Sequence, residues 1–336
     1  MAVMIRIAML STAHLHANSY AQEARNSSDV QITCVWDDDV KRGEAAAKEY
    51  GVPFDEDLAR VLSRKDVDAV VVCSETSKHR TILVAAAHAR KHIFVEKPLT
   101  LTAAEADEVA REIKSAGVKF MISLPQRSKS ETLLLKKLID EGTLGKIATA
   151  RFRMGHSAAL EKMFKDGSAW FGDEKFAGAG ALFDIACHTV DAMRWLLGEP
   201  ASVFCKSVNF TGAYPIPDNG VAVIEFKNKA VGILDFSYVQ GAGPNFWELY
   251  GTEGAAVRDM PGHPPVTYIL RQGADGFAPA WQRVKMPKPL PSAMKQWFAA
   301  ILGNEPAHVT VDDACNLTHL LEAARLSARE GREVKL

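Results

Sequence analysis

Residues 67–73 read Val-Asp-Ala-Val-Val-Val-Cys, a nearly continuous apolar run. Such a run is typical of a strand in a parallel sheet that helices cover on both faces. An Ala-rich helical stretch follows at 79–90, and a further apolar strand follows at 93–96. This succession of strand, helix and strand predicts a parallel sheet at this point of the chain.

The same alternation continues on both sides of that run. Further strands and helices are expected at 5–10, 30–36, 40–50, 103–116 and 118–123. Gly51 and Gly117 directly follow two of the expected helices, where a helix C-cap belongs. We therefore predict an α/β domain with a doubly wound parallel sheet over residues 1–125, whose ligand lies at the carboxyl ends of the strands.

The pattern changes after residue 125. Short strand-like segments are separated by a few turn residues, such as 227–229, which predicts antiparallel hairpins. One apolar helix is expected at 181–197, and two helices at 293–302 and 312–329 close the chain. We predict that residues 126–336 form an α+β domain with an open, mainly antiparallel sheet. Its free face would join copies into a homodimer or homotetramer.

The composition excludes several classes of partner. The 336 residues hold 40 Lys and Arg against 41 Asp and Glu, a net charge of −1. This balance argues against nucleic acid or an anionic membrane as the main partner. No apolar run approaches the roughly 18 residues of a membrane helix, and the first residues lack a signal-peptide layout. Five scattered cysteines without a C-x-x-C pair argue against a disulfide framework and favour a cytoplasmic protein.

The turn after the first strand bears on cofactor binding. Dinucleotide-binding folds place G-x-G-x-x-G there, so that the backbone can approach the pyrophosphate. Residues 11–17 read Ser-Thr-Ala-His-Leu-His-Ala, without a glycine. Ser11 and Ala13 are the smallest alternatives, and the hydroxyls of Ser11 and Thr12 could donate to phosphate. The segment is thus either a loosened dinucleotide turn or a plain connection. No metal is expected, because two histidines at alternate positions of a turn seldom converge on one ion.

An acidic cluster ends the second strand. Asp37 lies 26 residues after Ser11, close to the usual offset of about 20 for the carboxylate that binds the adenosine ribose. A carboxylate accepts hydrogen bonds from the ribose hydroxyls and repels a 2′-phosphate, so NAD is favoured over NADP. The alternative is that residues 37–39 are only a polar turn and helix cap. Arg42 is near enough to keep NADP open.

Two further segments could carry chemistry. Glu96-Lys97-Pro98 stands at the carboxyl end of an expected strand, where a lysine could act on a substrate hydroxyl or simply face solvent. The loop Gly178-Ala179-Gly180 opens the apolar helix, and Asp184 and His188 have the i, i+4 spacing of one helical face. A buried Asp and His need partners, so they are either a satisfied core pair or a catalytic pair.

Together these segments resemble the Gfo/Idh/MocA family of glucose–fructose oxidoreductase, inositol dehydrogenase and rhizopine-catabolism proteins. The resemblance rests on Val95-Glu96-Lys97-Pro98-Leu99, residues 178–191, Trp195-Leu196-Leu197-Gly198 and residues 328–334. Ala179, in place of the usual middle glycine, is a mild departure, and the glycine-free turn is a larger one. The resemblance implies a Rossmann-like first domain and NAD(P)-dependent oxidation or reduction of a secondary alcohol in a sugar, sugar derivative or cyclitol.

The resemblance also implies roles for residues of this chain. Lys97, Asp184 and His188 would be catalytic: His188 as the base, Lys97 sharing the proton or holding the alkoxide, and Asp184 orienting His188 or a substrate hydroxyl. Lys97 could itself be a base only if its pKa fell by about three units. The residues expected to contact the dinucleotide are Ser11, Thr12, Ala13, His14, Asp37, Ser74, Glu75, His79, Glu96 and Lys97. From their positions in the chain, Arg127, His156 and Trp170 are candidate substrate contacts, with Trp170 stacking on a sugar face, and for each taken singly a structural role is the more expected alternative.

Two other functions remain open. In a glycoside hydrolase or lyase, NAD would act as oxidant and reductant in turn, through a transient keto-sugar. A non-catalytic binding or regulatory protein would have lost its cofactor, and the glycine-free turn motivates this alternative. Net accumulation of NADH would separate a dehydrogenase from both.

Overall fold

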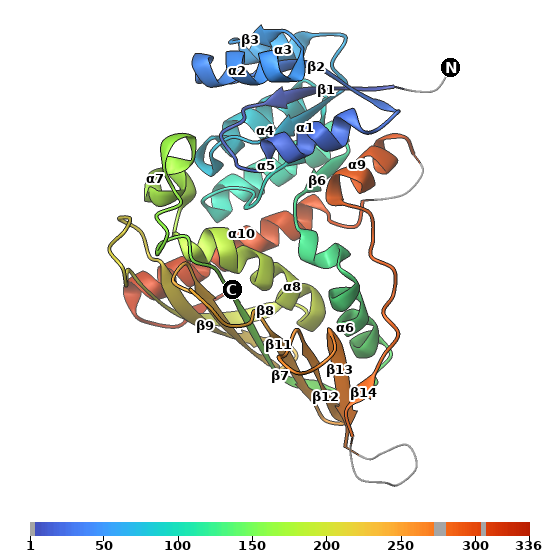
Figure 1. Ribbon diagram of the computed structural model, residues 1–336, viewed down its shortest axis with the longest axis vertical. Coiled ribbons are helices and arrows are strands. Elements are labelled where there is room, and N and C mark those ends of the chain that lie inside the picture. Colours follow the sequence, from blue (N-terminus) through green and yellow to red (C-terminus); the bar gives the residue numbers. More distant parts are fainter. Residues whose placement is uncertain (1–3, 272–279, 304–306) are drawn as a thin grey trace.

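The computed structural model describes residues 4–271, 280–303 and 307–336. Figure 1 shows two sheets at opposite ends of the molecule, with helices α8 (Cys187–Leu197) and α10 (Val311–Glu330) between them. Among the helices in these ranges, none is long and apolar enough to cross a membrane. The fold is therefore a pair of sheets that share a helical middle layer.

The first sheet is the expected doubly wound parallel sheet. All its neighbouring strands pair parallel, in the order β3-β2-β1-β4-β5-β6. The strands are β1 (Ile5–Leu10), β2 (Val30–Trp36), β3 (Phe54–Asp55), β4 (Ala69–Val72), β5 (His92–Val95) and β6 (Phe120–Ile122). Every residue of β4 is buried, as its apolar run predicts. The chain leaves β1 towards β2 on one side, while β4 lies on the other, so the topological switch point lies between β1 and β4.

Five helices flank this sheet, and their ends follow local sequence signals. They are α1 (Ala17–Arg25), α2 (Val40–Tyr50), α3 (Leu58–Ser63), α4 (His79–His88) and α5 (Ala103–Ala116). The helix α2 begins at its N-cap Asp39, whose side chain accepts from the backbone N–H of Arg42. Gly51 and Gly117 adopt φ values of 71° and 65° after α2 and α5, which confirms both predicted C-caps.

The second sheet is open and mainly antiparallel, as predicted. Its nine strands follow the order β14-β13-β12-β11-β7-β10-β9-β8-β15. They are β7 (Ile147–Gly155), β8 (Pro200–Val208), β9 (Asn219–Phe226), β10 (Val231–Ser237), β11 (Trp247–Gly251), β12 (Gly254–Arg258), β13 (Val266–Leu270), β14 (Gln282–Arg283) and β15 (Val334–Lys335). The hairpin expected at 227–229 joins β9 to β10. Among the described strands of this second sheet, β7 and β10 form the one parallel pair.

Helices of the second half reach both sheets. They are α6 (Ser130–Asp140), α7 (Glu174–Ala177), α8, α9 (Ala293–Ile301) and α10. Helix α10 packs against β8 on one side and α5 on the other. Helix α9 packs against β5 and β6, where the ring of Trp297 lies 5.7 Å from that of Phe94. The boundary between residues 125 and 126 stays a prediction, because this late helix returns to the first sheet.

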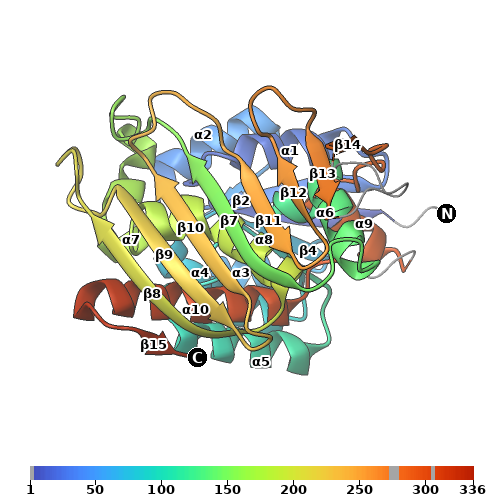
Figure 2. The ribbon, with the colours of Figure 1, turned by 90° about the horizontal axis from the view of Figure 1, so that it is seen from below.

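The large sheet keeps one face uncovered. Figure 2 shows its strands from that side, with α8 and α10 behind them. Apolar side chains are exposed on β8 and β9, among them Phe204, Val221 and Val223. This is the face that the sequence predicts to join copies of the chain.

Candidate active site

The carboxyl end of β5 brings Lys97 to the second half of the chain. The Lys97 ammonium donates to Asp184 Oδ1 at 2.6 Å and to the Asp184 carbonyl oxygen at 2.9 Å. The hydroxyl of Tyr238 donates to the other carboxylate oxygen of Asp184 at 2.8 Å. Two of the three predicted catalytic residues therefore form a direct ion pair, and Tyr238, which the sequence analysis missed, completes it.

Charge pairing decides the protonation of this pair. Burial alone lowers the pKa of Lys97, whose residue is only 5% exposed, but the Asp184 carboxylate raises that pKa above its ordinary value. Burial likewise opposes ionisation of Asp184, but the Lys97 cation lowers its pKa to about 2. Lys97 is thus a firmly held cation. This corrects the expectation that Lys97 could serve as a base through a depressed pKa.

His188 lies beside the pair but does not bond to Asp184. The predicted continuous helix instead opens with a π-helical turn, Leu182–Ala186, before α8 begins. A π-turn holds one more residue than an α-turn, so Asp184 and His188 lose the i, i+4 relation. Both oxygens of the Asp184 carboxylate accept from Lys97 and Tyr238 instead. The expectation that Asp184 orients His188 is therefore wrong.

The imidazole of His188 is neutral. Burial, and then the nearby Lys97 charge, lower its pKa to about 3. Its Nδ1 is buried and has no hydrogen-bond partner among the described residues. An orphaned buried nitrogen next to a fixed cation fits a bound polar molecule.

His156 stands next to the Asp184 ion pair. It directly follows β7, and Tyr238 directly follows the parallel neighbour β10, so the two rings stack at 5.1 Å. The Nδ1 of His156 accepts from the N–H of Ala158, which leaves the ring proton on Nε2. This position agrees with the predicted substrate contact, which remains a prediction.

The other two residues expected to contact substrate have structural partners. The Arg127 guanidinium is buried against Asp191, at 2.9 and 2.6 Å, and also donates to Asp313. The indole N–H of Trp170 donates to the carbonyl of Ala13 at 3.1 Å, so this ring lies on the turn of the first domain. The polar groups of both residues are therefore occupied within the protein, as the structural alternative expects, and their contact with substrate stays a prediction.

The glycine-free turn keeps the shape of a dinucleotide turn but uses its own donors. Ser11 adopts a φ of 66°, the left-handed conformation that glycine usually provides. The N–H of Thr12 donates to Asp37 Oδ2 at 2.9 Å, that of Ala13 to Ser11 Oγ at 3.3 Å, and that of His14 to the Cys73 carbonyl at 2.9 Å. The N–H groups of Thr12, Ala13 and His14, which could otherwise cradle a pyrophosphate, are therefore engaged by groups of the protein.

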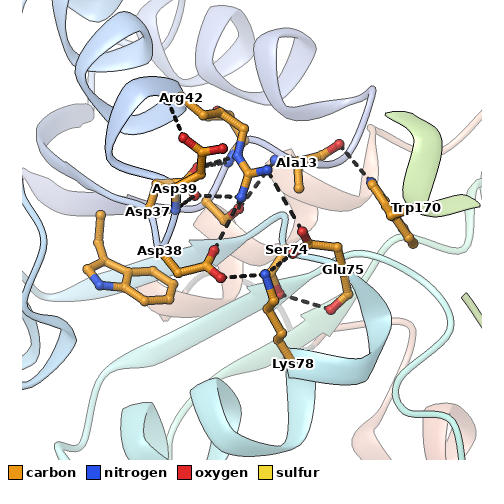
Figure 3. A network of polar contacts seen from close by, with 12 residues as sticks. Ala13, Asp37, Asp38, Asp39, Arg42, Ser74, Glu75, Lys78 and Trp170 are labelled. Atoms are coloured by element: carbon orange, nitrogen blue, oxygen red, sulfur yellow. Dashed lines mark hydrogen bonds and ion pairs between the residues drawn. The ribbon is translucent and has the colours of Figure 1, made fainter. Parts of the chain in front are cut away.

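Arg42, which the sequence shows only to be close to Asp37 along the chain, forms an ion pair with it. Figure 3 shows Arg42 reaching back over Asp37, with contacts at 2.8 Å to Oδ2 and 2.6 Å to Oδ1. The same arginine approaches Asp38 at 3.2 Å and Glu75 at 3.8 Å, and Lys78 pairs with Glu75 at 2.8 Å. The carboxylate of Asp37 is thus neutralised before any ribose arrives, and its predicted ribose contact stays a prediction.

His79 is buried, and both of its ring nitrogens contact backbone carbonyl oxygens. Its Nδ1 lies 3.1 Å from the carbonyls of both Pro98 and Leu99, and its Nε2 lies 3.3 Å from the carbonyl of Ser74. The ring therefore joins the end of β4 to the segment that follows Lys97. This corrects the expectation that His79 flanks the dinucleotide.

A groove of about 430 Å³ opens beside the turn, with Thr12, His14, Arg42, Lys165 and Ser168 among its lining residues. It lies between the first domain and a loop of the second. Its cations and hydroxyls suit a phosphate-bearing ligand beside the turn that follows β1, between residues of α1 and α2. The residues present thus fit a dinucleotide, although the turn offers fewer backbone donors than a glycine-rich one.

Lys97 stands at the carboxyl edge of the parallel sheet, and the second domain places Asp184 and His188 beside it. This arrangement is that of a two-domain, nucleotide-dependent oxidoreductase. Residues 5–124 match the family model described as "Oxidoreductase family, NAD-binding Rossmann fold". Residues 132–257 match the model of the GFO/IDH/MocA C-terminal domain. The chain belongs to the GFO/IDH/MocA family of NAD-binding oxidoreductases.

Similar proteins include characterised dehydrogenases. The chain is 28% identical to myo-inositol 2-dehydrogenase of Thermotoga maritima, over 83% of each chain. It is 29% identical to scyllo-inositol 2-dehydrogenase (NAD(+)) of Bacillus subtilis, over 80% of this chain and 78% of that one. A crystal structure of GenD2 from gentamicin A biosynthesis, in complex with NAD, has a TM-score of 0.82 at 25% identity, covering 99% of this chain and 97% of that one.

Proposed function

We propose that this protein is an NAD-dependent dehydrogenase that transfers a hydride between the nicotinamide and a secondary alcohol of a sugar, sugar derivative or cyclitol. The observation that carries the proposal is the Lys97–Asp184 ion pair beside the unpartnered Nδ1 of His188, at the ligand edge of the parallel sheet. The inositol dehydrogenases among the relatives support the substrate class.

The chain's own residues divide the acid–base work. Bound NAD⁺ supplies the hydride acceptor. Lys97, held as a cation by Asp184, stabilises the negative charge that develops on the substrate oxygen. His188 is the proposed acceptor of the substrate hydroxyl proton because its Nδ1 has no partner among the described residues, although burial and the Lys97 charge lower its pKa to about 3 and make it a weak base. Asp184 and Tyr238 are positioning residues, because they hold the Lys97 ammonium in place.

The dinucleotide would be held along the carboxyl ends of the strands. The residues proposed to contact it are Ser11, Thr12, Ala13, His14, Asp37, Ser74, Glu75, Glu96 and Lys97. We propose NAD over NADP on the carboxylate of Asp37 at the end of β2, although Arg42 pairs with that carboxylate and weakens its repulsion of a 2′-phosphate. We propose no metal for the reaction.

Calorimetric titration of the cofactor-stripped protein with NAD, and with NADP in parallel, tests the cofactor. Micromolar binding of NAD would be followed by a screen of sugars and cyclitols for NADH formation. Consumption of a glycoside without net NADH would favour the hydrolase or lyase alternative. No binding of either dinucleotide would refute the proposal and favour a non-catalytic binding protein.

A lysine substitution tests the site. Lys97→Met should lower turnover by about a hundredfold or more, the usual effect of removing one preorganised charge stabiliser, while NAD affinity changes little. Lys229→Met is the matched control, because Lys229 forms a surface ion pair with Glu225 far along the chain. Equal turnover in both variants would remove Lys97 from the mechanism.

We also propose that the uncovered face of the large sheet joins copies into a homodimer or homotetramer. The exposed Phe204, Val221 and Val223 support this, since an apolar sheet face is stabilised by burial. A monomeric mass by light scattering at micromolar concentration would contradict it.

A cytoplasmic location remains a proposal from the five cysteines, which are all free and buried.

A further inference from the structure

A cluster of ring and carboxylate groups joins the glycine-free turn to the end of β5. Glu96 is fully buried there, and its oxygens contact His16 Nδ1 at 2.8 Å and His14 Nε2 at 3.5 Å. The Tyr20 hydroxyl also bonds to Glu96, and the N–H of Lys97 donates to the same carboxylate at 3.0 Å. The proposed hydride transfer assigns no step to these four side chains.

The cluster has the composition of a metal site, but its protons are arranged otherwise. His14 Nδ1 accepts from the N–H of His16 at 3.2 Å, so the proton of its neutral ring sits on Nε2. Burial lowers the pKa of His14 to about 4, which keeps the ring neutral. The nitrogen that faces Glu96 therefore carries a hydrogen, whereas a metal ligand needs a lone pair there. Glu96 accepts hydrogen bonds from Tyr20 and from the N–H of Lys97 and contacts His16, whereas His14 Nε2 has no hydrogen-bond partner among the described residues.

Within this cluster His16 balances the buried carboxylate. Burial opposes the charge on Glu96, yet the neighbouring histidines hold its pKa well below the usual range. Lys97 has its ammonium on Asp184, and Tyr20 stays protonated because burial raises its pKa. The hydrogen bond to Glu96, the largest influence, raises the pKa of His16 above its ordinary value.

Each group around His16 can be placed. Glu96 and Asp184 favour its charged form, whereas burial and the Lys97 cation disfavour it, and His14 is neutral. His188 faces the same region from α8, but it is neutral. The carboxylate in direct contact outweighs the cation, whose charge is largely cancelled by its own partner.

His16 stands where a dinucleotide-binding turn has its third glycine. In the spacing of G-x-G-x-x-G, Ser11, Ala13 and His16 stand at the three glycine positions. His16 is the N-cap of α1, and 53% of its side-chain surface is exposed. No partner of its Nε2 is found among residues 4–271, 280–303 and 307–336. The ring therefore anchors one N–H on Glu96 and presents the other at the start of the helix, where the N–H groups of Thr12 and Ala13 are already engaged.

We propose that the His16 imidazolium, anchored on Glu96, supplies the positive charge and hydrogen bond to the diphosphate of the bound dinucleotide that the glycine-free turn does not provide. This inference rests on the proposed NAD dependence and deepens it. A charge-assisted hydrogen bond of this kind corresponds to about 10- to 100-fold in affinity.

The proposal predicts a pH dependence of binding with a definite sign. The protonated His16 binds the anion, so the affinity is constant below the pKa of free His16. Above that pKa the affinity falls by up to about tenfold per pH unit, until the pKa of the complex is passed. Because Glu96 raises the pKa of His16, the fall begins above the ordinary value of about 6.5.

Calorimetric titration with ADP-ribose tests this without turnover, because the diphosphate is the charged group of that ligand. We expect His16→Gln to bind about tenfold more weakly near pH 6 and to lose the pH dependence. His16→Lys carries a permanent charge, so it should retain affinity but show no fall up to about pH 8.5. His88→Gln is the matched control, because His88 is an exposed histidine on α4 that pairs with Glu112.

The outcomes separate this inference from the proposed function. If His16→Gln binds ADP-ribose as tightly as the wild type and with the same pH dependence, the role of His16 is refuted while NAD dependence stands. If the wild type binds neither NAD nor ADP-ribose at any pH, the dinucleotide site itself is refuted. If His16→Gln loses the circular dichroism spectrum of the folded protein, His16→Lys becomes the deciding variant. Its affinity for ADP-ribose must then stay near that of the wild type and be independent of pH.

Discussion

Replacing Asp184 by Asn leaves a buried lysine without its counter-ion. The Lys97 ammonium lies 2.6 Å from Asp184 Oδ1, and the lysine side chain is 4% exposed against 15% for the aspartate. Asn keeps the size of the side chain and can still accept from the Tyr238 hydroxyl. Asn has one acceptor oxygen, so its NH2 group then faces the Lys97 ammonium, and the substitution removes both the charge and the acceptor that Lys97 uses.

The structure sets the size of the effect. Two unit charges about 3 Å apart attract by roughly 5–6 kcal/mol at an effective dielectric constant of about 20. Removing one partner of a buried pair costs about 3–5 kcal/mol, because the other charge stays buried. We expect Asp184→Asn to lower the free energy of unfolding by about 3 kcal/mol at neutral pH. Lys97→Met/Asp184→Asn should be destabilised by at least about 2 kcal/mol less than the sum of the single variants.

The pH dependence has a sign that follows from the two pKa shifts. The pKa of Asp184 is lowered to about 2, so its contribution is present above about pH 4 and is lost as the pH falls through 2. The pKa of Lys97 is raised, so its contribution is present below about pH 10 and is lost as the pH rises through the shifted value. In Asp184→Asn, burial alone lowers the pKa of Lys97, so that variant should recover stability as the pH rises above neutral.

Urea unfolding of the wild type, both single variants and the double variant measures this coupling. Asp235→Asn is the control, because Asp235 forms only a half-exposed pair with Arg153 at 3.5 Å. Additive losses in the double variant, or a Lys97 that titrates no lower in Asp184→Asn than in the wild type, would refute the argument from the ion pair.

Three other substitutions probe separate contacts. Arg127→Ala strands the buried Asp191 carboxylate and should cost about 3–5 kcal/mol in urea unfolding, with an unchanged KM in the folded fraction; a selective rise in KM would restore its role in substrate binding. Gly180→Ala places a Cβ 2.1 Å from the Pro217 carbonyl oxygen at a φ of 56°, so its Tm should fall by several degrees, and an unchanged Tm would contradict this steric clash. Asp37→Ala should weaken NAD more than NADP in calorimetry, since it removes a ribose acceptor and frees a cation; equal losses would refute the ribose assignment.

Local sequence patterns accounted for the elements of both sheets. The apolar run that became β4 and the glycines after α2 and α5 predicted their structures directly, because burial on both faces and left-handed C-caps are properties of a few consecutive residues. Two-residue strands such as β3 and β15 were missed, since so short a segment carries no periodicity.

Some residues of the candidate site could be found from local motifs, and others are brought there only by the fold. The motif at Lys97 and the glycine loop before Asp184 pointed to the site through their resemblance to a family, but the i, i+4 rule failed across the π-turn at Leu182–Ala186. Tyr238 and His156 carried no motif at all. They meet because β7 and β10 pair in parallel, and nothing in either strand's own sequence specifies that neighbour.

By itself the sequence determined the parallel sheet, the antiparallel second domain and the residue types at the ligand edge. Only the tertiary structure decided which of these polar groups are free. Arg127 and Trp170 read as substrate contacts, yet Asp191 and the Ala13 carbonyl occupy them from 64 and 157 residues away. The physical reason is that a buried polar group without a partner costs free energy, so most buried polar groups have one, and the fold, not the neighbouring sequence, determines which partner comes within reach.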